Sequence, residues 1–240
     1  MIETMEKSRW AEAQHYEKNW WLRHAEKMNL RFYEGYAEEL LNEIGNYLNI
    51  VDDTVILEIG SGAAGILTFL KSKYRFAIDP LEDFYATIPK FLDFRDPNVN
   101  YYNGKGEELP FERSFFDFII MDNVLDHCDD PHKVMDEMNR VLKNGGIVFF
   151  RQNTYHGWGK FAREVLEHFK IDKGHPHTFT KRQLQKSFSE FSLNRLKTKR
   201  SGYFRVWLRE LTSGRVIDFA KALLFATRDK TLYILQKSIS

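Results

Sequence analysis

The sequence predicts an α/β fold, in which helices precede a doubly wound, mostly parallel sheet of seven strands that carries a C-terminal insertion. Short β-branched and aliphatic runs alternate with segments of helical periodicity from residue 54 onward. A glycine-rich turn, Gly60-Ser61-Gly62, follows the first of these runs. Such alternation implies right-handed crossovers and helices on both faces of the sheet.

The composition is that of a globular protein. Of the 240 residues, 43% are hydrophobic and 29% charged, so wholesale disorder is excluded and one large domain with an appendage is favoured. The single cysteine, Cys128, excludes an intrachain disulfide and a cysteine-rich zinc module. No stretch approaches the ~18 apolar residues of a membrane span. The amino terminus shows no secretory signal, so we expect a cytoplasmic protein.

Residues 1–50 predict two helices, which we expect to form an N-terminal helical lid. Aromatic side chains recur there with roughly helical spacing, and no proline interrupts them. These aromatics either cover a ligand or simply pack the helices together.

Residues 51–240 form the main domain. We expect strands over 54–59, 75–78, 99–102, 116–121 and 147–150, a helix over 66–71, and another over 134–142 that Asn144-Gly145-Gly146 stops. Later elements are helices over 161–169 and 181–188, the second capped by Thr180, and a strand over 192–198. The sheet closes with an antiparallel strand over 231–236, and residues 154–226 contribute cap segments on the substrate side.

The net charge of +1 is the sum of a basic C-terminal part and an acidic remainder. Residues 151–240 hold 19 Lys and Arg against 7 Asp and Glu, whereas the remainder holds 16 against 27. The segment 195–215 mixes these bases with Tyr203, Phe204 and Trp207. Such a segment suits nucleic acid, an anionic small molecule, a lipid surface, or a substrate cap with a solvated basic face.

The segment Gly60-Ser61-Gly62-Ala63-Ala64-Gly65 fits the pattern G-x-G-x-x-G after a strand. The pattern alone is shared by dinucleotide-binding folds and by folds that bind S-adenosylmethionine (SAM). Glu58 precedes it inside an apolar strand, where it would repel a pyrophosphate and suit an ammonium group. Asp79 ends the second strand, where an acid binds ribose hydroxyls in either class.

Five motifs in order resemble those of class I SAM-dependent methyltransferases, in particular their small-molecule branch. The resemblance covers residues 52–153. The motifs are Val55-Ile56-Leu57-Glu58-Ile59-Gly60-Ser61-Gly62, Ala77-Ile78-Asp79, Gly106-Glu107-Glu108-Leu109-Pro110-Phe111, Phe116-Asp117-Phe118-Ile119-Ile120 with Asp122-Asn123-Val124-Leu125-Asp126-His127, and Arg140-Val141-Leu142-Lys143-Asn144-Gly145-Gly146.

The resemblance implies SAM as cofactor and a role for each matching residue. Gly60, Ser61 and Gly62 would let the backbone approach the cofactor, Glu58 would bind its methionine end, and Asp79 would bind its ribose. Gly106 and Glu107 would lie beside the adenine. The floor below the sulfonium would be formed by Asp122, Asn123 and Val124. We expect Tyr16 and Trp20 of the lid, with Trp21, to shield the sulfonium. Lys105 departs from the family, which often has an acid or amide there to accept from adenine.

The acceptor chemistry rests on histidines. His127, at the exit of the fourth strand, and His177, in a later loop with His175, are candidate general bases because their pKa suits proton transfer near neutrality. A metal site from His175, His177 and Asp172 lacks a carboxylate cluster, so we expect no metal.

The sequence therefore predicts SAM-dependent methyl transfer to an oxygen, nitrogen or carbon of a small, anionic acceptor, with nucleic acid a less favoured partner. Two alternatives remain. One is a nicotinamide-dependent oxidoreductase that uses the same glycine loop, and the other is a non-enzymatic SAM-binding protein. The oligomeric state is not predicted.

Overall fold

The computed structural model describes residues 2–168 and 176–239 and is built around one mixed sheet. Its strands are β1 (Val55–Ile59), β2 (Tyr74–Asp79), β3 (Asn100–Asn103), β4 (Phe116–Asp122), β5 (Leu142–Tyr155), β6 (Phe179–Thr180), β7 (Leu193–Arg200) and β8 (Asp229–Lys237). The strand order is β3-β2-β1-β4-β5-β8-β7, and the two-residue β6 pairs with the end of β5. The seven strands of this path are the number predicted, and β6 is an addition.

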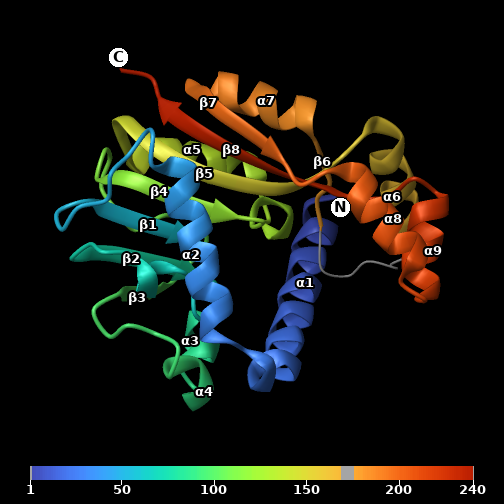
Figure 1. Cartoon of the computed structure of the whole chain (residues 1–240), viewed down its shortest axis with the longest axis horizontal. Helices are drawn as coiled ribbons and strands as arrows, with labels where there is room; N and C mark the ends of the chain where they lie inside the picture. Colours follow the sequence, from blue (N-terminus) through green and yellow to red (C-terminus); the bar gives the residue numbers. More distant parts are fainter. Residues whose placement is uncertain (1, 169–175, 240) are drawn as a thin grey trace.

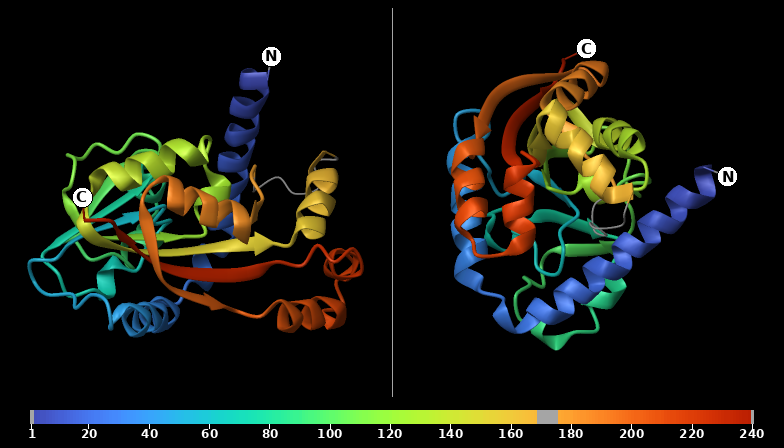
Figure 2. Two further views of the ribbon diagram at one scale, coloured as in Figure 1. Left: turned by 90° about the horizontal axis from the view of Figure 1, so that it is seen from above. Right: turned by 90° about the vertical axis from the view of Figure 1, so that its right-hand side faces the viewer.

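The helices are α1 (Ile2–His24), α2 (Leu30–Ile44), α3 (Glu82–Tyr85), α4 (Pro89–Leu92), α5 (Pro131–Val141), α6 (Gly157–His168), α7 (Lys181–Glu190), α8 (Tyr203–Thr212) and α9 (Val216–Leu223). Short 3-10 helices are η1 (Ala25–Lys27), η2 (Leu67–Phe69) and η3 (Leu125–His127). Figure 1 shows α2 across one face of the sheet, with α5 and α7 on the other. In Figure 2, α6, α8 and α9 lie at one end of the sheet and α1 projects away from it.

Two apolar layers hold the sheet between its helices. On the α5 and α7 face, Val134, Met138 and Phe188 pack against inward residues of β1, β4 and β5. On the opposite face, Leu40 and Ile44 of α2 pack against the alternate residues of the same strands. Parallel pairing runs through β3, β2, β1, β4 and β5, and β8 pairs antiparallel with β5, as the sequence predicts.

Two predicted elements are wrong. The expected helix over 66–71 is only the 3-10 helix η2. The expected stop at Asn144-Gly145-Gly146 is also misplaced, because α5 ends at Val141 and β5 begins at Leu142. Gly145, with φ of 76°, lies within β5 beside a register shift in its pairing with β4. The glycines therefore serve a strand irregularity rather than a helix end.

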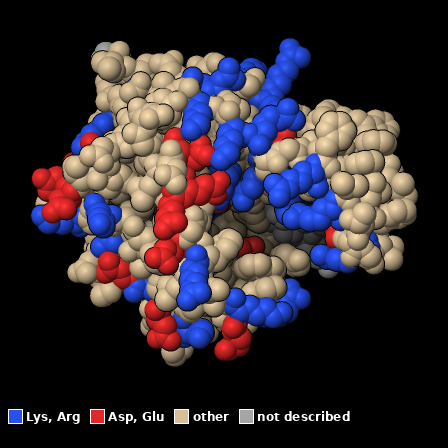
Figure 3. All heavy atoms as spheres, in the orientation of Figure 1, with Lys and Arg blue, Asp and Glu red and all other residues tan. Residues whose placement is uncertain are grey.

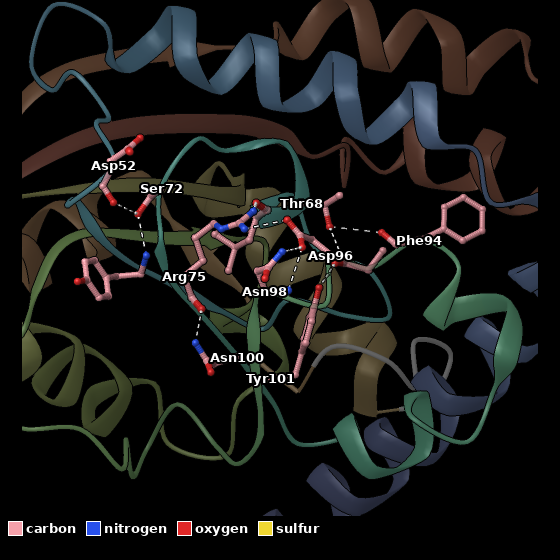
Figure 4. Close-up of polar contacts among 12 residues, drawn as sticks. Asp52, Thr68, Ser72, Arg75, Phe94, Asp96, Asn98, Asn100 and Tyr101 are labelled. Carbon is pink, nitrogen blue, oxygen red and sulfur yellow. Dashed lines mark hydrogen bonds and ion pairs between the residues drawn. The ribbon is translucent and has the colours of Figure 1, made fainter.

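A polar network holds the segment after the glycine turn where a helix was expected. Arg75 of β2 donates from Nη1 to the carbonyl of Leu67 at 2.8 Å and from Nη2 to Asp96 Oδ2 at 2.8 Å (Figure 4). The Asp96 amide donates to Thr68 Oγ1 at 3.1 Å, and Asp96 Oδ1 accepts from the Asn98 amide. Long-range hydrogen bonds thus position a segment that lacks the internal bonds of an α-helix.

We predict that Arg75→Leu lowers the free energy of unfolding by about 2–4 kcal/mol, because the Asp96 carboxylate and the Leu67 carbonyl lose a largely buried donor. The matched control is Lys73→Leu, which removes an ion pair to Asp52 whose two side chains are 67% and 70% exposed. It should leave stability nearly unchanged. Equal effects of the two substitutions in urea titrations would contradict the role assigned to Arg75.

Candidate active site

Three carboxylates lie at or next to the carboxyl ends of three neighbouring parallel strands, on one face of the sheet. Glu58 is in β1, Asp79 ends β2 and Asp122 ends β4. Side chains alternate between faces along a strand, so all three point to the α2 side, as do the core residues two positions earlier in each strand. Carboxyl ends of parallel strands form the usual ligand edge of this architecture. The register pairs Glu58 with Ala77 and Ile120, and Asp122 with Arg151 of β5.

The Glu58 carboxylate is buried beneath the glycine turn. Its Oε2 accepts from the Ile66 amide at 3.1 Å. A methyl group added at Gly65, whose φ is 67°, would lie 2.5 Å from Oε2, so only glycine allows the turn to close over the acid. Desolvation by burial raises the pKa of Glu58 to about 8; the Ile66 amide opposes this, and repulsion from Asp122 and Asp79 adds to it.

Asp79 is held by two backbone amides. Its Oδ2 accepts from Gly62 at 2.9 Å and its Oδ1 from Leu81 at 2.9 Å. Burial raises the pKa of Asp79 to about 6, although both amides favour the ionised form. Asp79 therefore joins the glycine turn to the start of the segment after β2.

Asp122 has a basic partner. Arg151 donates from Nε and Nη2 to its two oxygens, each at 2.8 Å, and also contacts Glu39 at 3.2 Å. Lys230 Nζ of β8 lies 4.0 Å from Asp122 Oδ1. These contacts lower the pKa of Asp122 against the effect of its burial, and burial lowers the pKa of Lys230. Asp122 is expected to remain ionised, unlike Glu58 at neutral pH.

The three acids line one cavity of about 380 Å³, a volume ordinary for a small-molecule site. Helix α1 supplies one wall, through Trp10, Gln14, Glu17, Trp20 and Trp21, and α2 supplies Phe32, Tyr33 and Tyr36. Five acidic and three basic side chains line the cavity, which leaves an acidic excess when all are ionised. A hollow with red and blue side chains at its rim is visible in Figure 3.

Most residues singled out in the sequence line this cavity. They are Glu58, Gly60, Ser61, Gly62, Asp79, Gly106, Glu107, Asp122, Asn123, Val124, Trp20 and His127. Trp21 closes over the glycine turn, since a methyl group at Gly62 would lie 2.7 Å from its Cζ2. Tyr16 differs from expectation, because it is not among the lining residues and is 41% exposed.

At the side of the cavity where adenine is expected, Glu107 and Lys105 both contact other parts of the chain. Glu107 Oε1 accepts from the amides of Asp129 and Asp130, at 2.7 and 3.1 Å, and so holds the loop before α5. Lys105 Nζ lies 3.6 Å from the centre of the Trp10 ring, a cation–π contact with the lid helix. Lys105 thus ties α1 to this end of the cavity.

The two candidate bases are separated. His127 lines the cavity, and its Nε2 lies 3.9 Å from Asp126 Oδ1. His177 lines a different depression, and its Nε2 lies 3.3 Å from the Asp129 carbonyl. His175 and Asp172 lie outside the described residues. Within the described part of the chain, no cluster of three or more His, Cys, Asp or Glu side chains is suited to a metal ion.

The range 154–226, expected as a cap on the substrate side, contributes none of its described residues to this cavity. A second cavity instead lies between the end of β5 and the start of α8, with Arg182, Arg200 and Arg205 among its lining residues. Among the described helices, none is both long and apolar enough to cross a bilayer.

Comparison with known proteins agrees with the geometry. Residues 57–150 match the family model described as a methyltransferase domain. The chain is 28% identical over 102 residues to a sarcosine/dimethylglycine N-methyltransferase of Aphanothece halophytica, which covers 40% of this chain and 37% of that protein. It is 26% identical over 142 residues to a thiol S-methyltransferase of Rattus norvegicus, which covers 56% and 58%. The chain thus spans only part of these curated relatives.

A solved structure extends the likeness over the fold. The geranyl diphosphate C-methyltransferase of Streptomyces coelicolor A3(2), in complex with Mg²⁺, geranyl diphosphate and S-adenosyl-L-homocysteine, superposes with a TM-score of 0.62. It covers 84% of this chain and 79% of that one at 15% identity. The domain match and the shared fold support a class I SAM-dependent methyltransferase, the family that the sequence resembles. The family resemblance read from the sequence is thereby confirmed, and SAM is the cofactor of this family.

Several residues that line the cavity were not predicted from the sequence. Tyr33 and Tyr36 read as helix-packing aromatics, and Trp10 was not singled out. In the sequence, Arg151 directly follows the strand expected over 147–150 and Lys230 directly precedes the one expected over 231–236, which is a weak signal for a site. In the structure, both lie within strands, β5 and β8. Only the pairing of β4, β5 and β8 places both beside Asp122.

Proposed function

We propose that this chain transfers a methyl group from SAM to an oxygen, nitrogen or carbon of a small anionic molecule. The observation that carries the proposal is the acidic edge formed by Glu58, Asp79 and Asp122. Glu58 and Asp79 have raised pKa values chiefly because burial disfavours their ionised forms. Repulsion from Asp122 and Asp79 adds to the shift of Glu58, and repulsion from Glu17 and Glu82 adds to that of Asp79. A ligand that brings positive charge relieves this repulsion, whereas a pyrophosphate increases it.

SAM supplies a sulfonium-bound methyl group and an ammonium group, and the residues present fit both charges. Glu58 would hold the methionine end and Asp79 the ribose hydroxyls. Glycine backbone at 60–62 would allow close approach, and 106–107 would flank the adenine. The aromatic α1 residues, with Trp20 and Trp21, would exclude water as a lid, which strengthens each charge interaction in the cavity.

The acceptor, in this proposal, occupies the side of the cavity between α2 and the ends of β5 and β8. Phe32, Tyr33 and Tyr36 form an apolar wall there, and Arg151 and Lys230 provide positive charge. The Arg151 guanidinium lies 4.2 Å from the Tyr36 ring centre and is neutralised by Asp122 and Glu39. Lys230 is therefore the base best placed to receive a carboxylate or phosphate of the acceptor.

His127 is the candidate general base, because it lines the cavity and His177 does not. A base is required only where the acceptor atom must lose a proton. The remaining work of the site is to orient the acceptor near the methyl group and exclude water. The nicotinamide alternative is disfavoured by the acidic edge, and a binding protein without acceptor chemistry is the remaining alternative.

For the cofactor, we predict binding of S-adenosylhomocysteine in the micromolar range and no binding of NAD. Asp79→Asn should weaken S-adenosylhomocysteine about 10- to 100-fold, since charge-assisted hydrogen bonds contribute roughly 1.5–3 kcal/mol. Asp83→Asn, on the exposed side of α3, is the control and should bind as the wild type does. Unchanged affinity of the Asp79 variant in calorimetry, or tight NAD binding, would overturn the assignment.

For the acceptor, we predict that aromatic and aliphatic carboxylates are methylated with a lower KM than their neutral methyl esters. The assay measures S-adenosylhomocysteine formed from SAM by chromatography. Lys230→Met should raise the KM of a carboxylate acceptor about tenfold or more and leave that of an ester unchanged, because one charged hydrogen bond is lost. Lys133→Met, on the surface of α5, is the matched control. Equal use of both compound classes would contradict an anionic acceptor.

A further inference from the structure

One apolar surface of the molecule has no part in the proposed methyl-transfer site. It is formed by the helical hairpin α8–α9 and the start of α6, and we call it the hairpin surface. Its exposed members include Trp158 and Phe161 of α6, Phe204 and Leu208 of α8, Phe219 of α9, and Phe225 just after α9. Phe204 is 78% exposed, and α8 has no buried residue along its whole length. Figure 3 shows this end as a largely uncharged lobe.

Hydrogen bonds, rather than burial, hold the hairpin surface together. The indole N–H of Trp207 donates to the Ala222 carbonyl at 3.0 Å and joins α8 to α9. The indole N–H of Trp158 donates to the Leu224 carbonyl at 3.0 Å and joins α6 to the end of α9. Because the polar atom of each ring faces inward, the Trp158 ring, 58% exposed, is displayed to solvent. The apolar side chains of three helices are thus fixed as one surface.

The end of α9 places an aromatic residue where glycine is usual. Phe225 has φ of 52°, its amide donates to the Ala222 carbonyl, and the Ala226 amide donates to the Lys221 carbonyl. These bonds form a Schellman motif, in which glycine avoids the steric cost of the left-handed conformation. The Phe225 ring stacks on that of Trp207 with 6.2 Å between ring centres, yet the side chain remains 52% exposed. An aromatic side chain that is half exposed at a position favouring glycine points to a role outside the folded chain.

Basic side chains surround the hairpin surface. Residues 203–228 contain five Lys and Arg against two acids, and Arg205, Arg209, Arg215 and Arg228 are exposed. Both acids have partners, since Glu210 accepts from Thr227 and Asp218 lies 3.4 Å from Arg215. Lys and Arg side chains border the uncharged lobe in Figure 3. The surface is therefore apolar at its centre and positive at its edge.

We propose that the hairpin surface docks this protein on a membrane that carries anionic lipid headgroups, with α8 and α9 lying in the plane of the interface. Aromatic and leucine side chains beside Arg and Lys are typical of helices that lie at a bilayer surface, and basic side chains near an anionic leaflet are attracted to it. A second copy of the chain fits less well, because a two-fold contact brings the same arginines together. Nucleic acid leaves the apolar centre unexplained.

The test uses the full chain and sedimented vesicles. One set is phosphatidylcholine alone, and the other contains phosphatidylglycerol at about a third of the lipid, so that surface charge is the only variable. We expect strong co-sedimentation with the anionic vesicles, weak co-sedimentation with the neutral ones, and a decrease with added salt. Trp158 fluorescence should shift to the blue on binding. The same result is expected without SAM, so failure of the proposed function would not affect this test.

The decisive variant is Phe225→Gly. Glycine suits the left-handed position, so thermal stability should be retained or raised, while the vesicle partition coefficient should fall about tenfold with loss of the aromatic side chain. Ile239→Ser removes an apolar side chain that is 83% exposed outside the hairpin surface, and it should leave binding unchanged. Arg205→Gln with Arg209→Gln should reduce binding to anionic vesicles alone.

Three results would overturn the proposal. They are no binding to either vesicle, binding that does not distinguish the two lipid compositions, and binding that Phe225→Gly leaves intact. Sedimentation velocity without lipid tests whether a second copy of the chain, rather than a membrane, covers the hairpin surface. A concentration-dependent dimer that Phe225→Gly disperses would assign the hairpin surface to a second copy of the chain.

Discussion

The burial of carboxylates at one edge of the sheet is the constraint on which the site depends. Glu58, Asp79 and Asp122 lie at or next to the ends of adjacent strands on the same face, so parallel pairing alone brings them together. The molecule neutralises Asp122 with Arg151, whereas Glu58 and Asp79 receive only backbone amides. Burial without a basic partner raises the pKa values of Glu58 and Asp79, which makes the site suited to positive charge.

The surrounding structure holds the acids in place. The glycine turn closes over Glu58, and the amide of Gly62 binds Asp79. Arg75 binds the carbonyl of Leu67 and so holds the segment after the glycine turn in place without an α-helix. Helices α1 and α2 line this edge of the cavity with aromatic rings, and apolar surroundings strengthen charge interactions. A cavity of this kind gains most from a ligand that matches its charges.

Strand positions and the cofactor motif were predictable because they depend on local runs of residues. The number of strands along the main path and the antiparallel last strand β8 were predicted as well, whereas the order of strands across the sheet was not. The failures have long-range causes. Residues 66–71 have the composition of a helix, yet hydrogen bonds with Arg75, itself bound to Asp96, hold them in a different conformation that contains only a 3-10 helix. The glycines at 145 and 146 read as a helix stop but lie in β5.

The lid was predicted from the aromatic content of residues 1–50, without asking which aromatic side chains share one face of the helix. Trp10, Gln14, Glu17 and Trp21 follow one helical face and line the cavity, whereas Tyr16 is out of phase with them. Arg151 and Lys230 were beyond sequence reasoning, because only the register of three strands brings them to Asp122. The acidic residues of the site are thus visible in local sequence motifs, whereas its basic residues are brought there by strand pairing.

The measurement that tests the acidic edge most directly is the number of protons released when SAM binds at pH 7. Without ligand, Glu58 has a pKa of about 8 and is mostly protonated at that pH. A bound cation favours the carboxylate and lowers this pKa, so binding should expel about one proton. Calorimetry in phosphate and in Tris, whose ionisation enthalpies differ, reports that number. We predict release by the wild type and none by Glu58→Gln; a wild-type enthalpy that is the same in both buffers would contradict the account.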